Sequence, residues 1–187
     1  MARQAVVQLE SISPFSWSKV IDEESKRAKE APEAAEARLW RERIHADADG
    51  NCFIPPMVFK KCLEESAKFL KEKIKGKGNS TWTKHFEAGV LVTDPLFVGV
   101  KKDDVKGERL FVPSDGQPGG GKRVWKIFPF IPEWKGSVVF HVLDDEITED
   151  IFKSTLENAG SFIGVGRFRP KNRGFYGRFA VKSIKWK

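Results

Sequence analysis

The residues best suited to bind a ligand lie in the last 28 positions of the chain, 160–187. This segment contains no Asp or Glu. Its eight basic residues are Arg167, Arg169, Lys171, Arg173, Arg178, Lys182, Lys185 and Lys187. Its six aromatic residues are Phe162, Phe168, Phe175, Tyr176, Phe179 and Trp186. Cations neutralise phosphates, and flat rings or guanidinium planes stack on unpaired bases. The segment is therefore a candidate nucleic-acid-binding surface.

Glycines interrupt the centre of this segment, and because they lack a Cβ they let a backbone approach a bulky anionic ligand closely. We expect the arginines to contact phosphates, and Phe175 or Tyr176 to stack on a base. Lys122 and Arg123 extend the surface if the fold brings their loop near. The expected nucleic-acid-binding residues are Gly164, Gly166, Arg167, Arg169, Lys171, Arg173, Gly174, Phe175, Tyr176, Arg178, Lys122 and Arg123. The alternative is a glycine-rich connection that is basic only for solubility.

The charge balance supports an anionic partner. The 187 residues carry a formal net charge of +7 at pH 7, with an isoelectric point near 9.4. The excess lies in the C-terminal segment and in 60–84, where eight lysines face three glutamates. Residues 22–43 are nearly neutral, with seven acids and six bases. Such a distribution favours a polyanionic ligand. No run approaches the length of a membrane helix, so we expect a cytoplasmic protein without a membrane partner.

The residue spacing gives less support to a disulfide, a metal site or a catalytic site. Cys52 and Cys62 do not form a CxxC pair, and we expect them to be reduced thiols in the core. No metal or other cofactor is expected, and the acidic stretch at 47–50 lacks the later ligands of a calcium loop. His45, ahead of His85, is the candidate acid–base residue of a metal-independent nuclease. Because neither has a partner at a telling spacing, we expect no catalytic residues.

The elements that must position these residues can be predicted from periodicity. Apolar spacing predicts amphipathic helices over 56–75 and 147–159, the second capped by Gly160. A stretch rich in Ala, Glu, Lys and Arg at 22–43 is expected to be helical, interrupted by Pro32. Residues 115–121 are an expected loop, and 125–131, which Pro132 follows, an edge strand. The other predicted strands are 5–12, 86–92, 96–100, 108–113, 137–143 and 176–186.

This order of elements predicts one α+β domain over residues 1–187. Two helices that connect strands of one antiparallel sheet would pack on the same face of that sheet. The opposite face would remain available for binding. The segment at about 20–45 would be a helical insertion.

Three motifs occur in a recognisable order. The stretch Asp47-x-Asp49-Gly50-Asn51-Cys52-Phe53-Ile54-Pro55 runs into a lysine-bearing helix. Strands at 125–131 and 138–143 precede the second helix. Gly164-Val165-Gly166-Arg167 and Arg173-Gly174-Phe175-Tyr176-Gly177-Arg178-Phe179 then lead into the last strand. This pattern, mainly over 44–74 and 134–182, resembles the repeat-associated mysterious protein (RAMP) superfamily, especially the backbone subunits of CRISPR effector complexes.

The resemblance implies a ferredoxin-like (RRM-like) core, RNA held across the sheet and the glycine-rich loop, and head-to-tail assembly. Cleaving members of the superfamily carry an Asp between the first strand and the D-x-x-G turn. Here that region is the 22–43 stretch, which has no equivalent Asp, so the resemblance implies binding without cleavage.

The expected function is therefore binding of single-stranded nucleic acid, RNA before DNA, as a homo-oligomer along the strand or as a subunit of a ribonucleoprotein complex. Two alternatives remain open. One is a phage-encoded protein that docks on a host nucleoprotein defence complex as an inhibitor. The other is a small metal-independent endoribonuclease.

Overall fold

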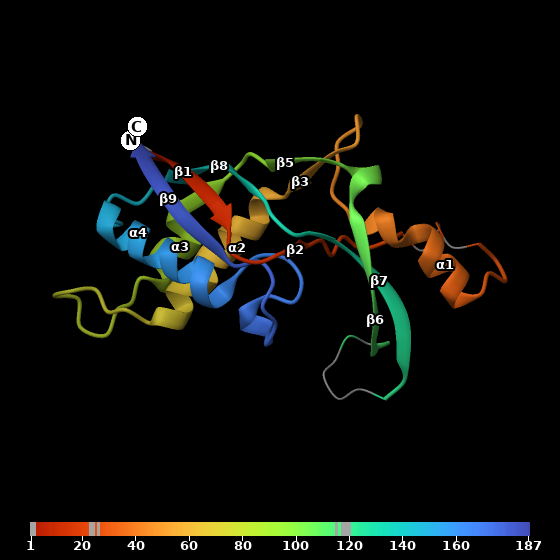
Figure 1. The fold of residues 1–187 in the computed structure, drawn as a ribbon. Coiled ribbons are helices and arrows are strands. Elements are labelled where there is room, and N and C mark those ends of the chain that lie inside the picture. Colours follow the sequence, from red (N-terminus) through yellow and green to blue (C-terminus); the bar gives the residue numbers. More distant parts are fainter. Residues whose placement is uncertain (1–2, 23–24, 26, 115, 117–120) are drawn as a thin grey trace.

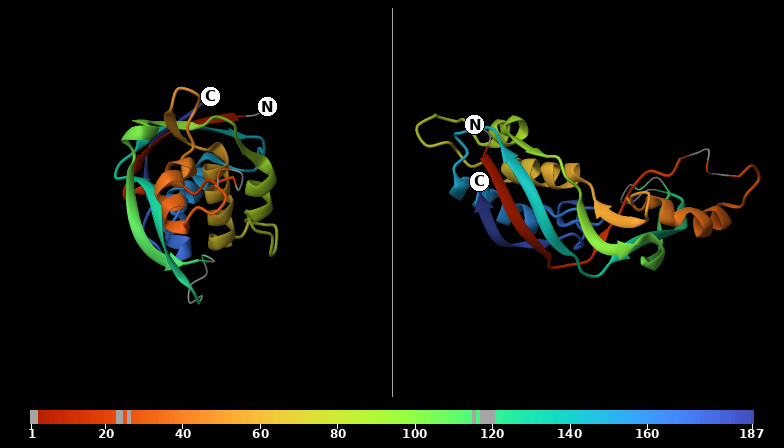
Figure 2. Two further views of the ribbon diagram at one scale, coloured as in Figure 1. Left: turned by 90° about the vertical axis from the view of Figure 1, so that its right-hand side faces the viewer. Right: turned by 90° about the horizontal axis from the view of Figure 1, so that it is seen from above.

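A sheet covers a layer of helices, and the two chain termini lie side by side (Figure 1). The computed structural model describes residues 3–22, 25, 27–114, 116 and 121–187. Most of the expected loop at 115–121 lies outside the described residues. The molecule is elongated, with the helical insertion and a long β-hairpin at one end (Figure 2).

The main sheet is four-stranded and antiparallel. In spatial order its strands are β4 (Val90–Val92), β8 (Lys135–Val142), β1 (Arg3–Ser11) and β9 (Phe179–Trp186). Helix α2 (Pro56–Leu70) connects β1 to β4, and α4 (Glu149–Asn158) connects β8 to β9. Each connection crosses over a neighbouring strand, so the order β1–α2–β4–β8–α4–β9 has the ferredoxin-like pattern. The predicted α+β fold class is confirmed.

The core lies between this sheet and the two helices. Alternating residues of β1 and β8 point to the helices, as the sequence predicts for strands with one buried face. Phe140 on β8 is fully buried and packs edge-on against Phe152 of α4, with ring centroids 5.4 Å apart. The other buried members of the two strands are Ala5, Val7, Leu9, Val138 and Val142.

The two cysteines belong to the same core. Cys52 and Cys62 are buried free thiols, which confirms the expectation of reduced core cysteines. Burial raises the pKa of the Cys62 thiol to about 12, so it stays protonated at neutral pH.

Three predicted element boundaries are wrong for local reasons. Helix α2 ends at Leu70, not near 75, because Lys71 turns the backbone left-handed with φ 50°. Residues 86–89, predicted as strand, form the end of α3 (Thr83–Gly89), where the Phe86 N–H donates to the Trp82 carbonyl. Gly160 does not cap α4. The helix continues as a π-helical turn, Ala159–Ile163. This turn ends at Gly164, which has φ 73°.

Gly160 instead allows close packing. A Cβ at this position would lie 2.2 Å from the carbonyl oxygen of Phe179. The π-helical turn can therefore approach the first residue of β9 only if residue 160 has no side chain.

Two smaller sheets extend the domain. β2 (Phe15–Ser16), β7 (Arg123–Ile131) and β6 (Lys106–Pro113) form one, in that order, and β3 (Asn51–Ile54) pairs with β5 (Leu96–Lys101) in the other. β7 was expected at an edge but lies between two strands. Its pairing with β2 is confined to Phe130 and Ile131, immediately before Pro132, so the proline falls where the ladder has ended.

Among its described residues, the insertion contains the short helix α1 (Pro32–Leu39), followed by a 3-10 turn at Trp40–Arg43. Pro32 begins this helix instead of interrupting it, since a proline at the first helical position lacks only an N–H that would be unpaired anyway. The carboxylate of Glu36 attaches the insertion to the hairpin. It pairs with Arg43 at 2.8 Å and accepts the Ile127 N–H of β7 at 2.7 Å.

The Glu36 carboxylate is therefore expected to stabilise the protein. In Glu36→Ala, the largely buried Arg43 guanidinium loses its partner and the Ile127 N–H loses its acceptor. We expect the free energy of unfolding to fall by about 2–4 kcal/mol. Urea denaturation of Glu33→Ala provides the control, because Glu33 is exposed and 3.8 Å from Arg109, so its loss should cost no more than about 0.5 kcal/mol. Equal losses in the two variants would contradict the anchoring role.

Candidate nucleic-acid interface

The residues 164–178 form a compact loop between the π-helical turn and β9, here called the glycine-rich loop. Its backbone is hydrogen-bonded to β2 and to the segment that joins β1 to β2. The Arg167 N–H donates to the Ser16 carbonyl at 3.0 Å, and the Gly177 N–H donates to the Pro14 carbonyl at 2.7 Å. The Ile12 N–H donates to the Arg178 carbonyl at 2.8 Å. The loop therefore has a defined position at the junction of the two sheets.

The glycines of this loop have a structural explanation inside the protein. Gly166 has φ 74°, and a Cβ there would lie 2.5 Å from the Phe15 ring. Gly177 has φ 72°, and its Cβ would lie 1.8 Å from the Val165 carbonyl oxygen. Added Cβ atoms at Gly164 and Gly174 would overlap with Pro170 and Phe168. The glycines let the loop pack on itself and on β2; their contact with a ligand stays a prediction.

Two of the expected phosphate-binding cations are paired within the chain. Arg169 and Lys171 both contact Glu65 of α2, at 2.8 and 3.0 Å. Glu65 could not be identified from the sequence, since it lies 104 positions before Arg169 in a stretch with an excess of lysines. This carboxylate offsets part of the positive charge and fixes the loop on α2.

Arg167 points away from this pair, toward the hairpin. Its guanidinium lies over the Phe128 ring of β7, 4.3 Å from the ring centroid. Its Nε is buried and has no hydrogen-bond acceptor among the described residues. Burial, and then the nearby charge of Arg43, lower the pKa of Arg167 to about 10, so the side chain remains charged at neutral pH.

The aromatic residues of the loop are divided between the core and solvent. Phe168 lies edge-on to Phe128 at 5.3 Å, which joins the loop to the hairpin. Tyr176 is buried, and its hydroxyl donates to Glu108 at 2.8 Å. Burial, followed by that bond, raises the pKa of Tyr176 to about 12. Phe175 is 61% exposed, so of the two candidates for base stacking it is the accessible ring.

The remaining expected cations lie in two places. Arg173 and Arg178 are exposed on the glycine-rich loop. Lys122 and Arg123 are exposed at the start of β7, five residues before Phe128. At about 3.3 Å per residue, that separation is about 17 Å along the strand. The structure thus brings the base of the hairpin to the loop and leaves Lys122 and Arg123 toward its tip.

The structure also adds basic residues that the sequence did not indicate. A cavity of about 590 Å³ lies beside Arg167, between the insertion and β7. Its basic lining residues are Lys19, Arg27, Arg43, Lys126 and Arg167. Arg27 and Arg43 come from the 22–43 stretch, whose acids and bases nearly balance, so its composition gave no indication of a basic site.

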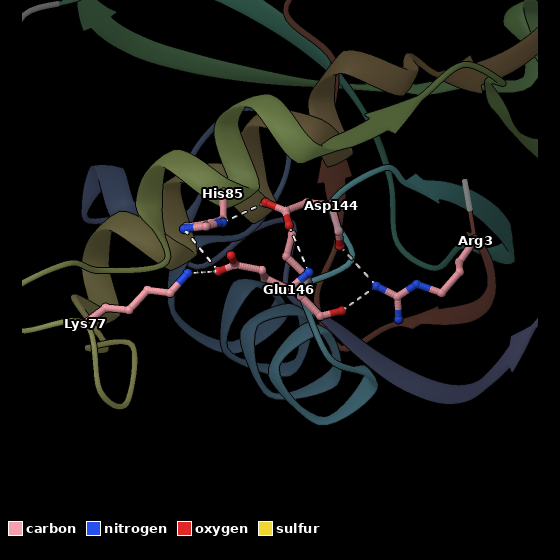
Figure 3. A network of polar contacts seen from close by, with 6 residues as sticks. Arg3, Lys77, His85, Asp144 and Glu146 are labelled. Atoms are coloured by element: carbon pink, nitrogen blue, oxygen red, sulfur yellow. Dashed lines mark hydrogen bonds and ion pairs between the residues drawn. The ribbon is translucent and has the colours of Figure 1, made fainter. Parts of the chain in front are cut away.

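A separate polar cluster surrounds His85 (Figure 3). The His85 Nδ1 lies 2.6 Å from an Asp144 oxygen, and Lys77 pairs with Glu146. Arg3 donates to the carbonyls of Asp144 and Ile147. Burial opposes ionisation of Asp144, but the Glu146 N–H and then His85 outweigh it and hold the pKa of this carboxyl below its usual value. The cluster joins α3 to the β8–α4 connection.

His45 lies elsewhere and has no such carboxylate. It is half-buried, with its ring 5.8 Å from that of Phe53. Burial, and then Lys19, lower its pKa, which disfavours the imidazolium form.

Asp47 accepts the Asp49 and Asn51 N–H groups, so the acidic stretch is the expected turn. Within the described ranges, no cluster of three or more His, Cys, Asp or Glu side chains is arranged to hold a metal ion. Over the same ranges no helix is long and apolar enough to span a bilayer.

The packing of the loop predicts unequal effects of two glycine substitutions. Gly177→Ala adds a Cβ against the Val165 carbonyl, whereas Gly76→Ala meets nothing within 4 Å, and both residues have positive φ. We expect Gly177→Ala to lower the free energy of unfolding by about 2–4 kcal/mol and Gly76→Ala by about 1 kcal/mol. Urea unfolding measures both. A loss at Gly177 no larger than at Gly76 would mean that the loop is not tightly packed.

No family model and no curated protein matches this sequence. Two solved structures share its fold. A chain of the type III-B Cmr-beta complex bound to cognate target RNA matches with a TM-score of 0.54 at 10% identity, over 99% of this protein and 60% of that chain. Cmr6 from Pyrococcus furiosus matches with a TM-score of 0.50 at 15% identity, over 97% of this protein and 99% of Cmr6. The protein therefore shares with these two structures the ferredoxin-like fold that its sequence predicted.

Proposed function

We propose that the protein binds single-stranded RNA, without cleaving it, as a RAMP-type subunit of a ribonucleoprotein complex. The observation that carries the proposal is the exposure of Arg173, Phe175 and Arg178 together on the glycine-rich loop. The fold supports RNA over DNA, since the Cmr-beta structure that shares it contains target RNA. Assembly of several copies along the strand belongs to the same proposal.

Each exposed residue has a distinct role in this proposal. Arg173 and Arg178 neutralise phosphates, which carry no sequence information. Phe175 stacks on a base, and every base offers a π-face, so binding tolerates many sequences. The buried Tyr176 supports Phe175 from beneath, with ring centroids 4.7 Å apart and planes nearly perpendicular. The glycines hold the loop in the shape that presents these side chains.

The loop arginines are expected to determine salt dependence. Arg173→Ala/Arg178→Ala removes two phosphate contacts, so affinity for a 30-mer RNA should fall about tenfold at low salt. The slope of log K against log salt should become shallower by about 1.4. Filter binding or anisotropy between 50 and 300 mM KCl measures both quantities.

The matched control is Lys84→Ala/Lys153→Ala, which removes the same net charge from exposed positions on α3 and α4. Its slope should stay that of the wild-type protein. If both double variants change the slope equally, the protein responds only to net charge and the loop is not the site. If neither wild-type nor variant retains RNA, the proposed function is wrong.

One observation favours cleavage as a second candidate. His85 and Asp144 form a close pair, as a general base and its orienting carboxylate would, whereas His45 lacks such a partner. We expect no cleavage, because Lys77 and Glu146 complete an internal network around this pair. Incubation of labelled RNA in EDTA tests the expectation, with His85→Ala as control. Products formed by the wild-type protein and absent with the variant would establish a ribonuclease.

A further inference from the structure

The cavity beside Arg167 has an apolar wall and also basic lining residues. It lies where α1, β7 and the glycine-rich loop meet, and its volume is about 590 Å³. This volume lies within the range of pockets that hold small organic ligands. The apolar lining comes from Val20, Ile21, Pro32, Ala35 and Leu39. Such a wall suits a flat, largely apolar group and gives no advantage to an inorganic anion alone.

The acids that line the cavity are already paired. Glu36 accepts two hydrogen bonds from Arg43 and one from the Ile127 N–H. Glu30 is paired with Arg38 at 2.6 Å. Their charges are therefore offset within the insertion. The positive potential in the cavity therefore comes from the other basic lining residues, among them Arg167 and Lys126. Among the described residues, the Lys126 ammonium donates one 3.3 Å bond, to the Ser114 carbonyl.

In the described part of the chain, the Arg167 guanidinium lacks a hydrogen-bond acceptor for its buried Nε. Phe128 covers part of its guanidinium, and its buried Nε has no acceptor among the described residues. An unpaired buried donor costs about 1–3 kcal/mol, and more when it is charged. The neighbouring Arg43 adds like-charge repulsion, in agreement with the lowered pKa of Arg167. An anionic oxygen at this place would relieve both costs.

We propose that this cavity binds one splayed nucleotide of the RNA strand, with the base on the apolar wall and the phosphate bonded by Arg167 and Lys126. The inference rests on the proposed function, because the nucleotide belongs to an RNA that the glycine-rich loop also holds. Unpaired bases that leave the stack are the usual target of sequence-selective RNA recognition. The cavity would therefore add base selectivity to a loop that binds tolerantly.

Ala35→Trp tests this assignment, since residue 35 lines the cavity and is only half-buried, so the indole fills the space without disturbing the core. Ala34→Trp is the matched control, one position away on the same helix and exposed. Both proteins and the wild type are titrated with a 30-mer RNA, with adenosine and uridine 5′-monophosphates, and with ribose 5-phosphate. Urea unfolding checks that the variants fold.

We expect Ala35→Trp to weaken the 30-mer about five- to tenfold with the salt slope unchanged, and Ala34→Trp to have no effect. In the wild-type protein at least one nucleotide should bind tenfold more tightly than ribose 5-phosphate, and Ala35→Trp should abolish this difference. Unchanged affinity of Ala35→Trp for the 30-mer would overturn the inference, whether or not free nucleotides bind, and would leave the proposed function intact. Failure of the wild-type protein to bind the 30-mer would instead show that the proposed function itself is wrong.

Discussion

The close backbone contact between the glycine-rich loop and residues 12–16 is the constraint on which the rest of the structure depends. β1 belongs to the main sheet and β2 to the hairpin sheet, and only three residues separate them. The loop is hydrogen-bonded to Ile12, Ser13, Pro14 and Ser16, so it is attached along the whole connection. Because Gly166 packs directly on Phe15, a side chain there would separate the loop from β2. The relative position of the two sheets follows from this contact.

The same contact fixes the environment of Arg167. Its N–H is held by Ser16, and its side chain crosses to Phe128 on β7. There it meets Arg43, whose charge is offset by Glu36. Glu36 thus has two effects, since it anchors the insertion and also limits the repulsion that Arg167 experiences. A largely buried cation such as Arg167 favours binding of an anion, because part of the cost of desolvating the cation is already included in the free energy of folding.

Much of the fold could be predicted because its signals are local. The alternation of Val138, Phe140 and Val142 and the spacing of Phe59 and Leu63 depend only on near neighbours. The errors occurred where two patterns compete. Phe86, Val90 and Val92 have the alternation of a strand, but Trp82 and Phe86 also have helical spacing. Tertiary packing favours the helix for residues 83–89, and the strand begins only at Val90. Gly160 has the right residue type for a cap, but contact with Phe179 in β9 determines its role.

The candidate site was predictable in part for the same reason. Composition alone located the basic, glycine-rich loop. It could not reveal Glu65, or the cavity, because both depend on contacts between segments far apart in the chain. Charge counting therefore attributed to the ligand two cations, Arg169 and Lys171, whose partner is in the protein.

Under the proposed function, this difference determines how strongly one subunit would hold RNA. Of the five loop cations, Arg169 and Lys171 share Glu65, Arg167 faces the cavity, and Arg173 and Arg178 face solvent. Two phosphate contacts give modest affinity, since each contributes through the counterions it releases. The proposed stacking on Phe175 and the proposed nucleotide in the cavity would add contacts that salt does not weaken in the same way. A strand held by several such subunits would nevertheless be bound tightly, because each additional subunit raises the effective concentration of the strand at its neighbours. Weak individual contacts are thus compatible with a protein that acts as one subunit of a larger ribonucleoprotein assembly.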